Sequence, residues 1–247
     1  MKLLHYGLQR SGTNFLEALL KRNFRVSFLN SARDRRSPLQ KHFRFYEQKN
    51  IVPEPQYRND LVVRTFAEFE ELFVKPPQFY VVISKDPYSW YLSYRNWAQI
   101  CNWPTVGHHY IEEYNLFYDS FLELAKQTDK ILFVRYVDLL QTDHAELQRL
   151  ASRMNLRRRP LLGLLSKTPR RVPQSSHFAD ERRDYYLRKD FMREFTAGEL
   201  RELNARLDHR VATALGYAEH DVPAPAARRP RQPVSTPHIR NTRSNNR

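Results

Sequence analysis

The amino-terminal end of the chain combines a short apolar run, a turn bounded by two glycines, and a helical repeat. Residues 2–6 are predicted to form a short buried strand, and residues 7–12 a turn. Residues 13–22 carry apolar side chains at the spacing of one helix face, which predicts a helix. A strand that passes through a glycine turn directly into a helix favours an α/β fold.

Strands and helices are predicted to alternate along the rest of the chain. The clearest strand is 79–84 (FYVVIS), whose continuous apolar run is typical of a sheet covered on both faces. Pro87 fits the first turn of the next helix, and Gly216 fits a helix end. The predicted strands are 2–6, 25–29, 61–63, 79–84 and 131–134. The predicted helices are 13–22, 66–73, 87–98, 110–128, 143–154 and 197–215. This alternation predicts a three-layer α/β fold, with a central parallel sheet and helices on both faces.

Charge and composition divide the chain into a body and a tail. Residues 1–220 show no internal repeat or boundary and are predicted to form one domain. Residues 222–247 contain six arginines and no acid, and the segment 221–247 is predicted to be disordered because it cannot build a core. The formal net charge is +14, and +8 remains without those six arginines. The body itself therefore favours anionic partners: nucleotides, nucleic acids, acidic glycans or anionic membrane surfaces.

Cysteine and hydropathy patterns bear on the compartment. Cys101 is the single cysteine, so neither a disulfide within the chain nor a cysteine metal cluster can form, which suits a reducing environment. No apolar run reaches the length of a membrane span, and the amino-terminal run is too short for a signal peptide. These features predict a cytoplasmic protein without a membrane span.

The turn at residues 7–12 has the outline of a phosphate-binding loop (P-loop). Gly7 and Gly12 lie five residues apart, and backbone N–H groups at such a turn can hold phosphate oxygens. In ATP-binding loops the second glycine is followed by lysine and then by serine or threonine. This pair is absent here, because the two positions hold Thr13 and Asn14. Arg10 instead places a cation inside the turn. We therefore expect an anionic nucleotide held without the usual Mg²⁺ clamp; the alternative is an ordinary strand–turn–helix connection.

A second candidate phosphate contact follows the strand at 79–84. Lys85 leaves the carboxyl end of this strand, where ligands of parallel sheets bind. Ser93 comes eight residues later, about two helical turns along, so it could face the same cavity. The alternative is that Lys85 is a surface cation and Ser93 an ordinary helix residue.

The glycine turn resembles the 5′-phosphosulfate loop of the sulfotransferases that use 3′-phosphoadenosine 5′-phosphosulfate (PAPS). The similar segment is residues 8–16, LQRSGTNFL. The resemblance implies that the 5′-phosphosulfate is contacted by Arg10, Ser11, Gly12, Thr13 and Asn14. Many family members have lysine where Arg10 stands; arginine keeps the charge but spreads it over a planar fork.

The second motif resembles the 3′-phosphate motif of the same family. Lys85, Pro87 and Ser93 match its spacing, although members usually have arginine where Lys85 stands. The similarity spans roughly residues 2–217, with only the two phosphate motifs specific. The family's carboxy-terminal Arg-Lys-Gly phosphate loop is not evident, and the candidates to replace it are Lys167, Arg170 and Arg171.

The resemblance implies a P-loop NTPase-like fold and an enzyme that needs no metal. Its activity would move a sulfuryl group from PAPS to a hydroxyl of a glycan or small-molecule acceptor, releasing 3′-phosphoadenosine 5′-phosphate (PAP). Two other functions stay open: another P-loop transferase, such as a nucleotide or small-molecule kinase, and a basic nucleic-acid-binding protein. The missing pair of lysine and serine or threonine disfavours the first, and no recognised motif supports specific nucleic-acid binding.

Sulfuryl transfer to a hydroxyl needs a base to accept its proton, and histidine suits this near neutral pH. His42 is the leading candidate. It lies in a long basic excursion, residues 30–60, beside Lys41, which would stabilise charge at the bridging oxygen; Arg10 is the third catalytic candidate. Rival groups begin a later helix: His108, His109, Glu112 and Glu113. An aromatic run is predicted to be mostly core, with some members candidates for an acceptor or adenine pocket: Trp90, Tyr91, Tyr94, Trp97 and Trp103.

Overall fold

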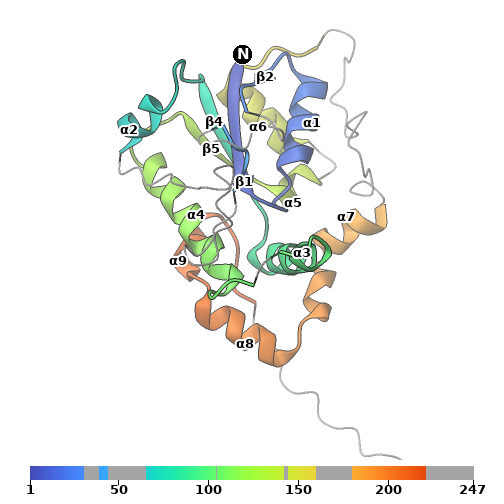
Figure 1. Ribbon diagram of the computed structural model, residues 1–247. Helices are drawn as coiled ribbons and strands as arrows, with labels where there is room; N and C mark the ends of the chain where they lie inside the picture. Colours follow the sequence, from blue (N-terminus) through green and yellow to red (C-terminus); the bar gives the residue numbers. More distant parts are fainter. Residues whose placement is uncertain (31–38, 44–64, 104, 142–143, 160–179, 221–247) are drawn as a thin grey trace, which may run out of the picture.

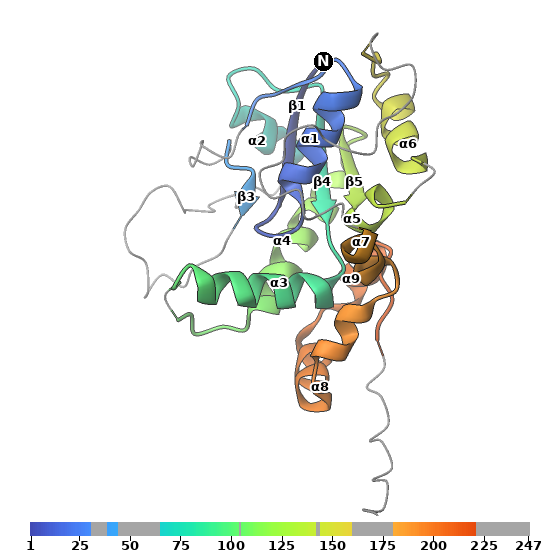
Figure 2. The same ribbon diagram turned by 90° about the vertical axis from the view of Figure 1, so that its right-hand side faces the viewer.

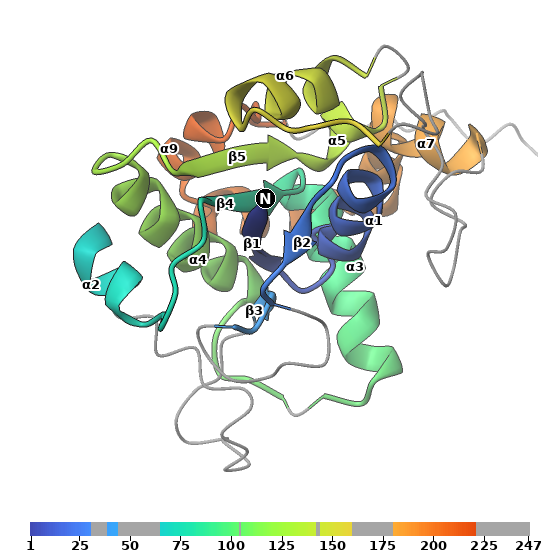
Figure 3. The ribbon, with the colours of Figure 1, turned by 90° about the horizontal axis from the view of Figure 1, so that it is seen from above.

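A parallel sheet forms the centre of the computed structural model (Figure 1). Its strands are β1 (Lys2–Leu8), β2 (Ser27–Phe28), β4 (Phe79–Ser84) and β5 (Ile131–Arg135), in the order β2-β1-β4-β5. A further two-residue strand, β3 (His42–Phe43), pairs in parallel with the end of β1. Seen from above, β5, β4, β1 and β2 follow one another across the molecule (Figure 3). Every pairing between these strands is parallel, which confirms the predicted α/β class.

The structure describes residues 1–30, 39–43, 65–103, 105–141, 144–159 and 180–220. Several predictions fall outside these ranges: the strand at 61–63, most of the excursion at 30–60, the phosphate-loop candidates Lys167, Arg170 and Arg171, and the tail at 221–247. They stay predictions.

The two central strands are apolar along almost their whole length. In β1 and β4 the side chains of Leu3, Leu4, Tyr80 and Ile83 are fully buried. Helices cover both sides of the sheet, with α1 and α6 on one side and α2 and α4 on the other (Figure 1). Burial on both faces explains why these strands read as continuous apolar runs and not as alternating patterns.

Most predicted helices appear within a few residues of their expected bounds. They are α1 (Thr13–Asn23), α2 (Phe66–Glu71), α3 (Pro87–Ile100), α4 (Tyr110–Ala125) and α6 (Ala145–Arg153). Shorter elements were not predicted, namely α5 (Tyr136–Leu139), α7 (Asp180–Leu187) and the 3₁₀ helix η4 (Asp190–Glu194). Among the residues described, no helix combines the length and the apolar character needed to cross a membrane.

Three predicted boundaries were wrong. The helix expected at 197–215 is two helices, α8 (Ala197–Arg206) and α9 (His209–Ala214), because Asp208 accepts hydrogen bonds from the N–H groups of Arg210 and Val211 and so starts a new helix. The strand expected at 25–29 pairs only over β2. The turn expected at 7–12 begins later, since β1 continues to Leu8. Gly216, at a φ of +80°, ends α9 as predicted.

The order of the strands reverses at β1. β2 pairs with one edge of β1 and β4 pairs with the other edge. The connection from β1 therefore leads to a strand on one side of it, and the later strand β4 lies on the opposite side. Ligands of open α/β sheets bind at the carboxyl ends of the strands that flank such a reversal. The glycine turn follows β1 and Lys85 follows β4, so both predicted phosphate motifs lie at this edge of the sheet.

Candidate functional site

The end of β1 and the turn after it each require a glycine. Gly12 has a φ of +103°, and a Cβ there would lie 2.6 Å from a ring carbon of Tyr136. A Cβ on Gly7 would overlap the hydroxyl of Ser11. No side chain caps the start of α1, and the first N–H groups of a helix have no acceptors within it. Such a helix start stabilises an anion, so the local geometry fits a phosphate group.

The predicted loop residues differ in what their side chains can reach. The side chains of Ser11 and Thr13 are buried, whereas Asn14 is exposed and Arg10 is half-buried. Arg10 also adopts a φ of +74°, which places it in the left-handed region. Any ligand at this turn would therefore meet Arg10 and Asn14 through side chains, and Ser11 and Thr13 chiefly through the backbone.

Arg10 connects the glycine turn to the second motif. Its Nε donates a hydrogen bond of 3.3 Å to Oγ of Ser93, and its guanidinium carbon lies 4.6 Å from the ring centroid of Trp97. The indole N–H of Trp90 donates to the carbonyl of Gln9 at 3.0 Å. The turn is therefore attached to α3 at three positions, and the structure brings together Arg10 and Ser93, which are 83 residues apart in sequence.

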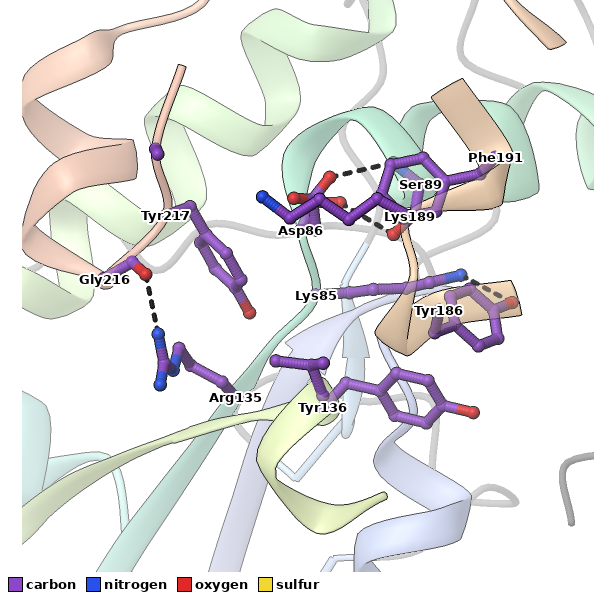
Figure 4. Close-up of a pocket in the computed structure, with 12 residues that line it drawn as sticks. Lys85, Asp86, Ser89, Arg135, Tyr136, Tyr186, Lys189, Phe191, Gly216 and Tyr217 are labelled. Atoms are coloured by element: carbon purple, nitrogen blue, oxygen red, sulfur yellow. Dashed lines mark hydrogen bonds between the residues drawn. The ribbon is translucent and has the colours of Figure 1, made fainter. Parts of the chain in front are cut away.

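A cavity of about 190 Å³ opens at the carboxyl ends of β4 and β5 (Figure 4). Lys85 extends into it with only 4% of its surface exposed. Its Nζ donates to the hydroxyl of Tyr186 at 3.1 Å and lies 4.4 Å from the centroid of that ring. Lys85 is therefore a buried cation at a strand end and not the surface cation of the alternative interpretation. The residues that line the cavity include Lys85, Asp86, Ser89, Arg135, Tyr136, Tyr186, Lys189 and Tyr217.

Two further cations line this cavity. Arg135 donates to both carboxylate oxygens of Asp138, at 2.7 and 3.0 Å, and to the carbonyl of Gly216, so its position is fixed (Figure 4). Lys189 lies at the start of η4 with a φ of +58° and is exposed. Sequence reasoning missed Arg135, Tyr186 and Lys189 as site residues. One signal was present, because Arg188 and Lys189 form a basic pair in the part of the chain where a basic phosphate loop was sought.

Tyr136 and helix α3 place the cavity beside the glycine turn. Tyr136 lines the cavity and packs against Gly12. On α3, Ser89 lines the cavity and Ser93, one turn further along, contacts Arg10. Arg10 itself is not part of the cavity wall. Ser89 and Ser93 lie one turn apart on α3, so the contact of Arg10 with Ser93 lies one helical turn from a residue that lines the cavity of Lys85.

Lys41 and His42 lie next to the end of β1. The backbone of His42 pairs with Gly7, and the structure does not describe the His42 side chain. Lys41 has only 3% of its surface exposed, and its Nζ donates to Glu17 at 2.6 Å. The Lys41 ammonium group is therefore engaged by a carboxylate of α1, and it holds β3 against the sheet.

Glu17 is the centre of a partly buried charge network. Burial alone would raise the pKa of Glu17, but the neighbouring His5 and the hydrogen bonds from Lys21 and Lys41 lower it well below the usual range. His5 is fully buried, and burial lowers its pKa although Glu17 lies 3.4 Å from Nε2 and Asn30 3.0 Å from Nδ1. The carboxylate is thus held ionised between three basic side chains.

Replacing Glu17 with glutamine is expected to cost about 3 kcal/mol of unfolding free energy, because it leaves the Lys41 ammonium buried without its carboxylate. The double variant Glu17→Gln/Lys41→Met should recover most of this loss. Lys21→Met is the matched control: Lys21 also contacts Glu17 but is about half exposed, so it should cost less than about 1 kcal/mol. Urea unfolding at pH 7 measures all three.

The Glu17 variants also test how the unfolding free energy depends on pH. A lowered folded pKa means that the stability from Glu17 is present above its unfolded pKa of 4.5 and is lost as the pH falls below it. Wild type should therefore lose more stability than Glu17→Gln between pH 5 and pH 3. Equal losses, or a double variant no more stable than the single one, would contradict this account of the network.

The rival base candidates lie elsewhere. Glu113, with 1% of its surface exposed, accepts a hydrogen bond from Tyr94 at 2.5 Å and contacts Nε2 of His108 at 2.9 Å. His109 caps α4 through its Nδ1, and Glu112 pairs with Arg206. The two histidines line a separate open pocket of about 560 Å³, formed with Tyr91, Arg95 and Trp103. On α3 these pocket residues fall on the face opposite Ser93, so the rivals are not brought to the Lys85 cavity.

The aromatic run divides between core and surface. Trp90 and Tyr94 are fully buried and stack with ring centroids 4.6 Å apart, as the core prediction requires. Tyr91, Trp97 and Trp103 are half-buried.

Among the described residues, no group of three or more His, Cys, Asp or Glu side chains gathers closely enough to hold a metal ion. In comparisons with known proteins, no family model and no curated protein matches this chain.

Proposed function

We propose that this chain is a sulfotransferase that moves a sulfuryl group from PAPS to an acceptor hydroxyl. The observation that carries the proposal is the contact between Arg10 of the glycine turn and Ser93 of the second motif. This contact lies where the strand order reverses, the usual ligand position in an open α/β sheet. Two anion-binding motifs that meet there suit a nucleotide with phosphates at both ends of its ribose.

In the proposed complex, the 5′-phosphosulfate lies at the start of α1, against the N–H groups after Gly12 and the guanidinium of Arg10. The 3′-phosphate lies toward Lys85, with Ser93 and Lys189 as further donors. Neither motif supplies the lysine and hydroxyl that hold Mg·ATP in other P-loop proteins. Cationic side chains and backbone N–H groups would therefore neutralise the donor without a metal.

The transfer itself needs positioning and charge stabilisation. The acceptor oxygen attacks sulfur, the bond from sulfur to the 5′-phosphate oxygen breaks, and PAP leaves while a base takes the hydroxyl proton. Arg10 would offset the charge on the departing phosphate. His42 remains the proposed base, since its backbone lies beside the end of β1. A direct role for Lys41 at the bridging oxygen would require it to leave Glu17; in place, it fixes the strand that carries His42.

Titration with PAP tests the proposal most directly. PAP is expected to bind without Mg²⁺ and at least tenfold more tightly than ATP, because the second motif supplies a site for its 3′-phosphate. At 100 times its dissociation constant, PAP should add about 2.7 kcal/mol to the unfolding free energy, visible in a thermal melt. Isothermal titration calorimetry with and without Mg²⁺ measures both affinities. ATP binding that is tighter than PAP binding and depends on Mg²⁺ would favour the kinase alternative.

A further inference from the structure

Four exposed arginines gather where the chain after α1 meets the chain after α6. Phe24 and Arg158 form an antiparallel bridge, flanked by hydrogen bonds from Arg25 N to Arg157 O at 2.9 Å and from Arg159 N to Asn23 O at 3.0 Å. These two short segments form a small ladder. We call the three exposed arginines that share one face of it the arginine cluster: Arg25, Arg157 and Arg159.

The ladder places like charges directly opposite each other. Its register pairs Arg25 with Arg157, and opposite residues of an antiparallel pair carry their side chains on one face, with Cβ atoms about 5 Å apart. Arg159, two residues beyond Arg157, lies on that same face, whereas Arg158, between them, lies on the opposite face with its partner Phe24. None of the three cluster arginines forms an ion pair with a residue that the structure describes, and Nε of Arg159 donates to the carbonyl of Phe24 at 3.2 Å. Opposed like charges destabilise a ladder, so an external anion would relieve an unfavourable arrangement.

The arginine cluster lies at the opposite end of the sheet from the Lys85 cavity. Arg25 comes just before β2, whose Ser27 pairs with Lys2 at the start of β1, whereas Lys85 and the glycine turn follow the strand ends. In Figure 2 the amino terminus and α6 lie in the upper part of the molecule, away from α3 and α7. A ligand on the cluster is therefore separate from the proposed donor site.

We propose that the arginine cluster is a sequence-independent contact surface for the phosphate backbone of nucleic acid. The guanidinium group presents a planar fork that matches phosphate oxygens, and a nucleic-acid backbone presents phosphates at regular short intervals. The cluster holds no aromatic side chain to stack on bases, which fits backbone contact and not base readout.

An anionic membrane fits the cluster less well. Binding to an anionic membrane takes apolar side chains beside the cations, yet the exposed large apolar residues lie on other parts of the described chain, at Leu72, Val74, Ile100 and Leu116.

The test compares two variants of the full chain with equal charge loss. One is Arg25→Gln/Arg157→Gln/Arg159→Gln; the matched control is Arg201→Gln/Arg206→Gln/Arg210→Gln, on exposed positions of α8 and α9. Affinity for a random-sequence DNA duplex is measured by fluorescence anisotropy between 50 and 200 mM salt. The cluster variant should weaken binding at least tenfold at the lowest salt and reduce the slope of log K against log salt by about 2 to 3. The control should change binding less than threefold.

Parallel titrations with heparin and with phosphatidylserine vesicles identify the partner class. The cluster variant should lose less affinity for either than for the duplex. Equal weakening of duplex binding by the cluster and control variants would overturn the proposal, because net charge alone would then explain it. A larger loss toward heparin or vesicles would also overturn it. Thermal melting of the cluster variant should give an unchanged or higher midpoint, since one opposed like-charge pair is removed; a lower midpoint would contradict the strain argument.

Discussion

Replacing Lys85 with methionine is expected to lower the affinity for PAP about 100-fold, close to 3 kcal/mol, without lowering the stability of the free protein by more than about 1 kcal/mol. A charged hydrogen bond to phosphate is lost, which accounts for the affinity. In the free protein a buried ammonium group costs desolvation energy, and an apolar side chain of similar length removes that cost. This offsets the lost contacts with Tyr186. Calorimetry and urea unfolding measure the two quantities separately.

Lys85→Arg is the matched control for this prediction. It keeps the positive charge and should bind PAP within about tenfold of wild type, with the difference set by how well the fork fits the cavity. Lys85→Met that binds PAP as tightly as wild type would remove Lys85 from the proposed donor site. A large loss of stability in the free Lys85→Met protein would instead assign Lys85 a structural role among the tyrosine rings.

Replacing Gly12 with alanine is expected to destabilise the fold by about 3 kcal/mol and to abolish measurable PAP binding. The backbone at a φ of +103° is strained for any residue with a Cβ, and that Cβ would overlap the ring of Tyr136. For a domain of this size, such a loss lowers the melting temperature by roughly 10 °C. Thermal melting and a PAP titration below the midpoint measure the two effects.

Gly198 supplies the control for Gly12. It lies in the first turn of α8, and the nearest atom to a Cβ there would be Oγ1 of Thr196 at 3.9 Å. Gly198→Ala should therefore leave PAP binding unchanged and stabilise the protein by up to about 1 kcal/mol, since alanine is the better helix former. If Gly12→Ala melted like Gly198→Ala, the turn would not have the conformation described here.

The sequence was informative where local chemistry decides the structure. The continuous apolar run at residues 79–84 predicted the bounds of β4 without error, because a strand that is buried on both faces needs apolar side chains along its whole length. The glycine turn and Pro87 marked where α1 and α3 begin for equally local reasons: backbone conformation at Gly12 and a fixed φ at Pro87. The break between α8 and α9 was missed, because the apolar spacing of one helix continues across Leu207. The side chain of Asp208 nevertheless caps a new helix there.

The candidate site depended much more on the tertiary structure. From sequence, the turn with Arg10 and the motif with Lys85 and Ser93 were two separate motifs joined by a resemblance; the reversal of strand order at β1 is what brings Arg10 against Ser93. Spacing could not show that Tyr186 and Lys189, about 100 residues after Lys85, complete its cavity. It also could not show that Lys41 is held by Glu17.

The sequence by itself determined the α/β class, the glycine turn and the basic character of the chain, because strand burial, glycine conformation and charge are properties of short segments. Only the tertiary structure decided which cations share a cavity and which arginines stand opposed across the small ladder at the far end of the sheet. The reason is physical. Contacts between distant segments depend on strand order and register, and no local propensity encodes either of them.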